Sequence, residues 1–206
     1  MQSYGLYGKS GTRLIDLSTG EVTKASPGAA DQFGEGISRR SDGHLLQLTW
    51  REGVVNVLDP QTLSVTSTLP IDTQGWGICI DDSGQAWTSD GSSTLTARDP
   101  GTMTASGSIE VRLDGAPVRA LNELECTPDG IWANVWHQDR LLRISPEDGR
   151  VTATLDLTDL AARAPRSDTQ PRSEEALNGI AWDGASGLLW VTGKEWTEIY
   201  GLSLSQ

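Results

Sequence analysis

The sequence is poor in several residue types, beginning with cysteine. Its 206 residues include two cysteines, two histidines and one phenylalanine. Two cysteines, Cys79 and Cys126, are too few for a disulfide framework, and they lack the C-x-x-C spacing and the nearby histidines that a zinc site needs. We therefore expect two buried thiols and no metal site.

Long apolar runs and basic residues are also scarce. No stretch of ~18 apolar residues exists to span a bilayer, and the first residues, "MQSYGLYGKSG", lack the charged and then apolar pattern of a signal peptide. Lysine and arginine together number 16 against 28 for aspartate and glutamate, so the net charge is −12. Such a field repels a nucleic-acid backbone. These absences predict a soluble chain without a nucleic-acid or membrane partner.

The length fits one domain, since domains typically run ~100 to 200 residues, and a repeat organises it. Four turns have the same pattern: "DLSTGEV" at 16, "DPQTLSV" at 59, "DPGTMTA" at 99 and "SPEDGRV" at 145. The leading Asp or Ser can hydrogen-bond the backbone beyond it, and proline presets φ at the second turn position. Each pattern predicts a hairpin corner. Short alternating strands come before these corners, and a fifth, "TEIYGLSL", closes the chain.

A second series of motifs comes before the last four of these five strands, one motif before each: "FGEGI", "GWGIC", "LNELE" and "LNGIA". Alignment puts Glu35, Trp76, Asn122 and Asn178 in one column, with spacings of 41, 46 and 56 residues. A polar glycine turn and another strand follow each time. Meanders of ~40 residues stacked radially form a β-propeller, so the sequence predicts an all-β, five-bladed β-propeller.

Two strands of that ring have no sequence to form them. The first-strand column, projected back from Glu35 by one repeat, falls before Met1, and the chain ends after the third strand of the fifth blade. We expect residues 1–206 to form a single propeller domain that lacks the innermost strand of blade one and the closing outer strand. On this interpretation the chain is truncated at its N-terminus.

The connection before the last blade is long, which explains the 56-residue spacing. "DLTDLAARA" predicts a short helix, and "PRSDTQPRSEEA" predicts an exposed loop. Such an insertion serves either as a lid over one face or as a spacer.

The first strands of propeller blades line a central channel, so the aligned column predicts a ring of side chains there. The ends of the second strands predict another ring, made of Gly5, Trp50, Gly91, Trp136 and Lys194. Convergent polar groups among aromatic side chains are typical of a small-ligand site, and a lone acid among them is a candidate for proton transfer. The alternative is structural: a solvated Glu35 or one paired with Lys194, and tryptophans that serve packing.

Eight motifs in order carry a family resemblance. They are "GLYGKSGTRLIDLSTG", "FGEGI", "LTWREG", "GWGIC", "LNELE", "IWANVW", "LNGIA" and "VTGKEW". From Gly5 to about Tyr200 the chain resembles the plant and bacterial type of glutaminyl cyclase, also called glutamine cyclotransferase. The resemblance implies a five-bladed propeller that converts the N-terminal glutamine of a peptide or protein into pyroglutamate and releases ammonia, without a metal or other cofactor. Members of that family are often secreted or periplasmic.

The resemblance also implies roles for individual residues. The glutamate of "FGEGI", Glu35, matches the family's catalytic acid. The family's segment with an aromatic residue, Thr and Gln-Gly on the first inner strand has no counterpart here. The residues that match those around the substrate are Phe33, Trp50, Trp76, Asn122, Trp136 and Lys194.

Two other functions stay open from the residues alone. A metal-dependent lactonase of the propeller type would use Glu35, Asn122 and Asn178 as oxygen ligands around calcium. Against it, the inner column supplies one carboxylate and an indole, a poor cage for a divalent cation. The second alternative is a propeller that binds peptides without catalysis.

Overall fold

The structure is a computed structural model that describes residues 1–167 and 176–204, and the regular secondary structure of these residues is almost entirely β-strand. The chain divides into two compact units. The first holds Met1–Asp90 and Leu95–Ser108, and the second holds Gly91–Thr94 and Ile109–Gln206.

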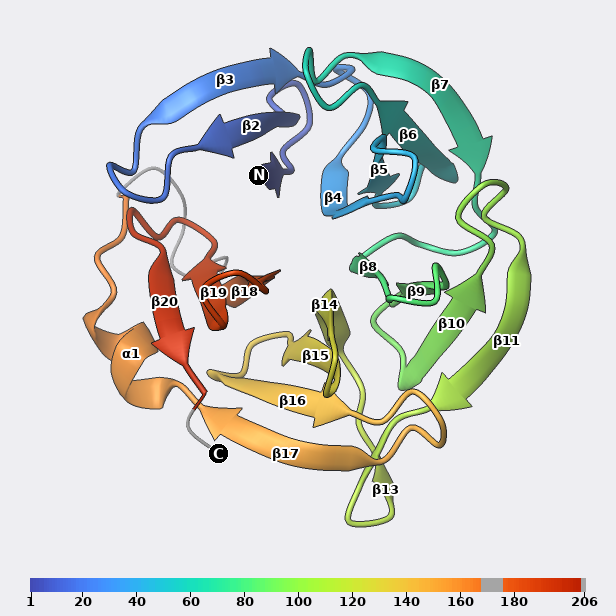
Figure 1. Cartoon of the computed structure of the whole chain (residues 1–206), viewed down its shortest axis with the longest axis vertical. Helices are drawn as coiled ribbons and strands as arrows, with labels where there is room; N and C mark the ends of the chain where they lie inside the picture. The colour runs from blue at the N-terminus through green and yellow to red at the C-terminus, as the bar shows by residue number, and fades with distance from the viewer. Residues whose placement is uncertain (168–175, 205–206) are drawn as a thin grey trace. The chain divides into compact units, whose positions relative to one another are not determined.

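Three antiparallel sheets make up the first unit (Figure 1). Each sheet is a meander, because strands that follow one another in the chain pair side by side. The strands are β1 Gln2–Tyr4, β2 Gly11–Ile15 and β3 Val22–Pro27 in the first sheet; β4 Gly34–Arg39, β5 Leu45–Thr49, β6 Val54–Leu58 and β7 Val65–Pro70 in the second; and β8 Ile78–Ile80, β9 Ala86–Thr88, β10 Thr94–Arg98 and β11 Ala105–Glu110 in the third, which ends in the second unit.

The second unit holds two further meanders, a small hairpin and one helix. The hairpin was not predicted from the sequence, whereas the helix lies within the predicted stretch. The elements are β12 Arg112–Leu113 and β13 Ala116–Pro117 in the hairpin; β14 Leu121–Thr127, β15 Gly130–Val135, β16 Arg140–Ile144 and β17 Val151–Asp156; α1 Thr158–Arg163; and β18 Leu177–Asp183, β19 Leu188–Gly193 and β20 Tyr200–Ser203.

Five meanders in succession confirm the repeat and the fold class, a five-bladed β-propeller. Within the described residues, the first and last sheets have three strands each and the other three meanders have four, as predicted. Of the predicted loop "PRSDTQPRSEEA", residues 168–175 lie outside the described part of the chain.

The predicted corners form because aspartate side chains hold the turns. The Asp59 carboxylate accepts the backbone N–H groups of Gln61, at 2.9 Å, and Thr62, at 2.7 Å. Leu63 follows with a φ of 61° and 1% exposure, so burial of its side chain offsets an unfavourable backbone conformation. Met103 repeats this arrangement after Asp99.

Each unit has its own apolar core. In the first unit Leu46, Leu48, Val55, Ile78 and Met103 belong to one buried cluster. In the second unit residues of β15, β16, β18 and β19 pack with α1 and the segment after it. Members of that cluster are Trp132, Leu141, Ala161, Leu177, Leu189 and Trp196.

The two cysteines correct the expectation of buried thiols. Cys79 on β8 and Cys126 on β14 are both disulfide-bonded. The prediction failed because a pair of cysteines far apart in the sequence gives no local signal of bonding.

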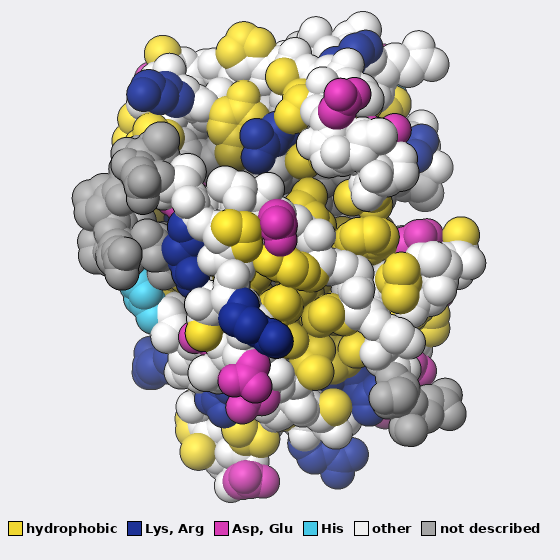
Figure 2. All heavy atoms as spheres, turned by 90° about the vertical axis from the view of Figure 1, so that its left-hand side faces the viewer, with side chains coloured by type: hydrophobic (Ala, Val, Ile, Leu, Met, Phe, Trp, Pro, Cys, Tyr) yellow, Lys and Arg dark blue, Asp and Glu magenta, His cyan; other side chains and the backbone are white. Residues whose placement is uncertain are grey.

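No helix in the described part of the chain is long and apolar enough to cross a membrane. On the face drawn in Figure 2, basic side chains are interspersed with acidic and hydrophobic ones.

Candidate functional site

Three of the four residues in the aligned column lie at β-bulges of inner strands, and the fourth, Trp76, precedes β8. Pairing of β4 with β5 shifts between Gly34 and Ile37, so Glu35 falls in the shift. The β14–β15 pair shifts between Leu121 and Leu124, and the β18–β19 pair between Leu177 and Ile180. These shifts include Asn122 and Asn178. Bulges re-aim side chains and are common next to active sites, so the backbone singles out the positions that the repeat predicts.

A repeated hydrogen bond holds three of the five residues predicted for the second ring. The backbone N–H of Trp50 donates to the Phe33 carbonyl at 3.0 Å, two residues before Glu35. Trp136 and Lys194 make the same bond to the carbonyls two residues before Asn122 and Asn178, each at 2.8 Å. Trp50, Trp136 and Lys194 are therefore equivalent positions of three sheets, as the sequence alignment predicts.

In the first unit a close backbone approach joins β4 to the segment that precedes β8. The Gly36 N–H donates to the Trp76 carbonyl at 2.9 Å. A Cβ atom at residue 36 would lie 2.9 Å from the Gly77 Cα, so only glycine fits there without displacement. Buried Ser89 accepts the Gly77 N–H at 2.8 Å, which fixes the backbone that carries Trp76.

Three aromatic side chains of the same unit, Tyr7, Phe33 and Trp50, form a row that we call the aromatic wall. The Phe33 ring lies 5.6 Å from the Trp50 ring and 5.5 Å from the Tyr7 ring, measured between centroids. The Arg51 guanidinium lies 3.7 Å from the Trp50 ring, a cation–π contact.

Tyr7 connects this wall electrostatically to the predicted acid. The hydrogen bond to Glu52 raises the pKa of Tyr7, desolvation and the charge of Glu52 add to it, Arg51 opposes it, and the charge of Glu35 contributes a further increase. Glu35 itself is half-buried. Sequence reasoning missed both Tyr7 and Glu52, although both lie in quoted motifs, because neither stands in an aligned column.

In the second unit the predicted tryptophan and lysine meet. The Lys194 ammonium lies 4.5 Å from the centroid of the Trp136 ring. The same indole also contacts the His137 ring, with 4.6 Å between the two ring centroids. Trp136 and Lys194 are half-buried, and Asn122 is 4% exposed. An ammonium stacked on an indole face presents N–H donors beside an apolar surface.

Asn134, a buried residue on β15, holds the bulge of β18. Its side-chain amide donates to the Leu177 carbonyl at 3.3 Å and accepts the Gly179 N–H at 3.1 Å. The peptide groups on both sides of Asn178 are thereby held by Asn134. The Asn178 Oδ1 is buried without a hydrogen-bond partner within the described residues.

A second acid, Glu125 on β14, is half-buried in the same unit. It pairs with Trp132 across the sheet and accepts the backbone N–H of Trp182. Burial raises the pKa of Glu125 to about 8, against the lowering effect of that hydrogen bond. The carboxyl is therefore largely neutral at pH 7.

The predicted site residues divide between the two units. Phe33, Glu35, Trp50 and Trp76 lie in the first, and the structure brings Phe33 and Trp50 into contact there. Asn122, Trp136 and Lys194 lie in the second, where Trp136 contacts Lys194. The described residues contain no group of three or more His, Cys, Asp or Glu side chains that could hold a metal ion.

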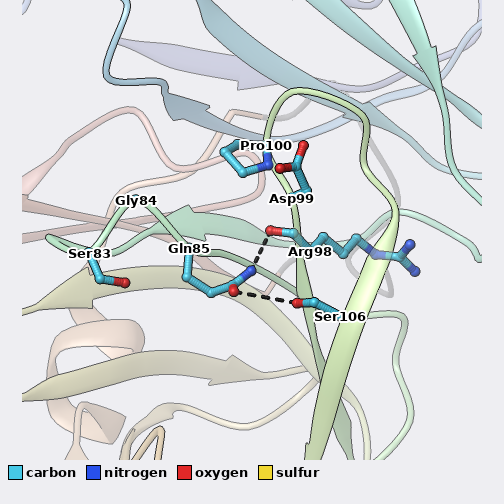
Figure 3. A pocket seen from close by; sticks show the side chains of 7 residues that line it. All are labelled: Ser83, Gly84, Gln85, Arg98, Asp99, Pro100 and Ser106. Carbon is cyan, nitrogen blue, oxygen red and sulfur yellow. Dashed lines mark hydrogen bonds between the residues drawn. The ribbon is translucent and has the colours of Figure 1, made fainter.

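A separate hollow on the β8–β11 sheet holds none of these residues (Figure 3). Its volume is about 250 Å³. Gln85 spans it by donating to the Arg98 carbonyl and accepting the Ser106 hydroxyl. The Arg98 guanidinium points away from the hollow and binds Asp72 at 2.7 Å and Thr88 at 3.0 Å. These contacts serve the sheet, and the lining residues are Ser83, Gly84, Gln85, Arg98, Asp99, Pro100 and Ser106.

Comparison with known proteins gives consistent results. Residues 1–204 match the family described as glutamine cyclotransferase. Glutaminyl-peptide cyclotransferase of Arabidopsis thaliana is 39% identical over 207 residues, which cover 100% of this chain and 63% of that protein. The chain thus spans less than two thirds of the length of this relative.

Solved structures agree with the sequence matches. The crystal structure of Myxococcus xanthus glutaminyl cyclase is 30% identical, with a TM-score of 0.87 and coverage of 97% of this chain and 84% of that one. Virginiamycin B lyase of Staphylococcus aureus is 13% identical, with a TM-score of 0.54 and coverage of 96% and 60%, and so shares only the fold.

Proposed function

Because the chain belongs to the glutamine cyclotransferase family, we propose that it is a glutaminyl-peptide cyclotransferase. Its substrate is a peptide or protein with an N-terminal glutamine, and its products are the pyroglutamyl chain and ammonia. The observation that carries the proposal is the family match over residues 1–204. Within that match, the motif glutamate Glu35 falls in a bulge of an inner strand.

Glu35 is the proton shuttle in this proposal. The neutral α-amine of the substrate attacks its own γ-amide carbon, a C–N bond forms, and the carboxylate of Glu35 accepts a proton from the attacking nitrogen. The tetrahedral intermediate then collapses, its other C–N bond breaks, and Glu35 returns the proton to the leaving nitrogen as ammonia forms. General acid–base catalysis of this kind contributes typically ~10² to 10⁴-fold.

The remaining work is to hold the folded substrate. Ring closure is intramolecular, so the substrate itself supplies the proximity of the reacting atoms. Asn122, Lys194 and the tryptophan N–H groups are the proposed donors to the amide oxygen as it becomes an oxyanion, and one such donor is typically worth ~3 kcal/mol. Phe33, Trp50, Trp76 and Trp136 offer apolar faces that exclude water from the compact glutamine side chain.

Two alternative functions require different properties of the site. A calcium-dependent lactonase would require Glu35, Asn122 and Asn178 to act as ligands, yet calcium normally takes 6 to 8 oxygen ligands, several of them carboxylate. A propeller that only binds peptides would bind a glutaminyl peptide without changing it.

One experiment separates these functions. The protein is incubated with a dipeptide that begins with glutamine, and ammonia is measured with and without a chelator. Cyclisation that survives chelation supports the proposal. Binding without ammonia release supports the peptide-binding alternative, and loss of the activity on chelation favours a metal-dependent enzyme. A dipeptide that begins with asparagine is the matched control, because closing its ring would give four members.

A further inference from the structure

The two backbone amides that precede Glu35 are both held by side chains from other segments. Glu52 accepts the Phe33 N–H at 3.4 Å, and Ser10 accepts the Gly34 N–H at 3.1 Å. The next two residues fall in the bulge, where ladder hydrogen bonds are disrupted. Side-chain anchors therefore act directly at the point where the regular pairing of β4 stops.

The loop between β1 and β2 supplies one end of this arrangement. The Ser10 hydroxyl accepts the Leu6 N–H and donates to the Leu6 carbonyl, each at 3.0 Å, which closes the loop on itself. The Gly8 N–H donates to the Ala30 carbonyl at 3.0 Å. Tyr7 stands in this closed loop, between its two anchored ends.

Tyr7 and Glu52 join the loop to the aromatic wall. The Tyr7 hydroxyl donates to one carboxylate oxygen of Glu52 at 2.8 Å, and the other oxygen accepts the Phe33 N–H. The Tyr7 ring meets the Phe33 ring edge to face, at 71° between their planes. One carboxylate thus fixes both the hydroxyl of Tyr7 and the backbone of the residue whose ring Tyr7 contacts.

We propose that Tyr7 and Glu52 form a positioning pair that sets the orientation of Glu35 and of the Phe33 ring. This inference rests on the proposed function, because it assigns the pair to the same reaction. Neither residue exchanges a proton with the substrate. Glu52 acts through the Phe33 amide, and Tyr7 holds Glu52 in the geometry that reaches that amide.

Loss of the positioning pair should lower kcat and leave KM nearly unchanged. A misplacement of 1 Å at a reacting group can cost ~10²-fold. Tyr7→Phe removes one of several anchors and keeps the ring contact with Phe33, so we expect kcat to fall about tenfold, with KM within about twofold. Glu52→Gln retains an acceptor for the Phe33 amide but loses the charge that strengthens both bonds, and we expect a similar loss.

A matched control exists on β20. The Tyr200 hydroxyl donates to Glu198 at 2.7 Å; Glu198 is exposed and Tyr200 is half-buried in the second unit. Tyr200→Phe removes the same kind of hydrogen bond, and we expect kcat and KM to be unchanged.

Hydrogen exchange at the Phe33 amide tests the pair independently of activity. We expect Tyr7→Phe and Glu52→Gln to accelerate it about three- to tenfold, as loss of an ordinary hydrogen bond would, with no change in Tyr200→Phe. Unchanged kcat, or a lower kcat with unchanged exchange at Phe33, would overturn the positioning role. If Glu52→Gln lowers the melting temperature markedly, Tyr7→Phe alone decides, because it preserves the ring packing.

The proposed function and the positioning pair can each be refuted separately. If the unmodified protein releases no ammonia from a glutaminyl dipeptide, the proposed function is wrong. Exchange at Phe33 then still decides the anchoring: acceleration in the variants supports it, and equal rates reject it.

Discussion

The half-buried acid Glu125 should make the stability of the fold depend on pH in an unusual direction. Its pKa rises from 4.5 to about 8 in the folded chain because the carboxyl is desolvated. From pH 4.5 to pH 8 the unfolded chain ionises this group while the folded chain keeps it protonated. The contribution to stability therefore decreases as pH rises through that range and is constant above it.

The size of the effect follows from the same values. Each tenfold change in acidity corresponds to ~1.4 kcal/mol, so a pKa that rises from 4.5 to about 8 means that ionised Glu125 costs the fold roughly 4 to 5 kcal/mol. Glu125→Gln has nearly the same shape and can still accept the Trp182 N–H. The variant has no carboxyl to ionise at this position, so above pH 8 the fold no longer bears the free-energy cost of a charged Glu125.

Urea unfolding followed by tryptophan fluorescence at pH 5, 7 and 9 measures this prediction. The difference in unfolding free energy between Glu125→Gln and the unmodified protein should grow in favour of the variant as pH rises. Other titrating groups cancel in that difference. Glu147→Gln, at an exposed corner of the same sheet, is the matched control, because it removes a carboxyl that is in contact with solvent. A difference for Glu125→Gln that varies with pH no more than that of the control would refute the reasoning.

Three further predictions address the proposed reaction and its support. Glu35→Gln should lower kcat by ~10² to 10⁴-fold with the melting temperature nearly unchanged, and near-normal ammonia release would remove Glu35 from the mechanism. Trp136→Phe weakens the contact with Lys194 and should raise KM by about three- to tenfold, more than it lowers kcat in steady-state assays; the reverse pattern would place Trp136 at the reacting atoms. Gly36→Ala puts a Cβ 2.9 Å from the Gly77 Cα and should cost ~1 to 3 kcal/mol of unfolding free energy, whereas a stability equal to that of the unmodified protein would show that this approach is not tight.

The repeat made much of the fold predictable. Turn residues such as Asp59 and Asp99 act locally, so the sequence reveals the corners that they hold. The column of Glu35, Asn122 and Asn178 was also visible, because alignment of repeats compares equivalent backbone positions. The bulges at these positions could not be predicted, since they depend on pairing with a neighbouring strand.

Contacts that occur only once, without a second copy in the repeat, could not be predicted from the sequence. Tyr7 and Glu52 are 45 residues apart and meet through the packing of one loop on one strand. Disulfide formation by Cys79 and Cys126 likewise depends on the folded backbone. The β12–β13 hairpin interrupts the repeat in one place, so there was no second copy to reveal it.

The main-chain hydrogen bond that recurs in three sheets holds the backbone independently of the side chains that are proposed to react. The carbonyls of Phe33, Ala120 and Ala176 each accept a backbone N–H, so this bond does not depend on the side chain two places later. The residue two places later can therefore differ between sheets, as Glu35, Asn122 and Asn178 do, while the same main-chain bond is kept.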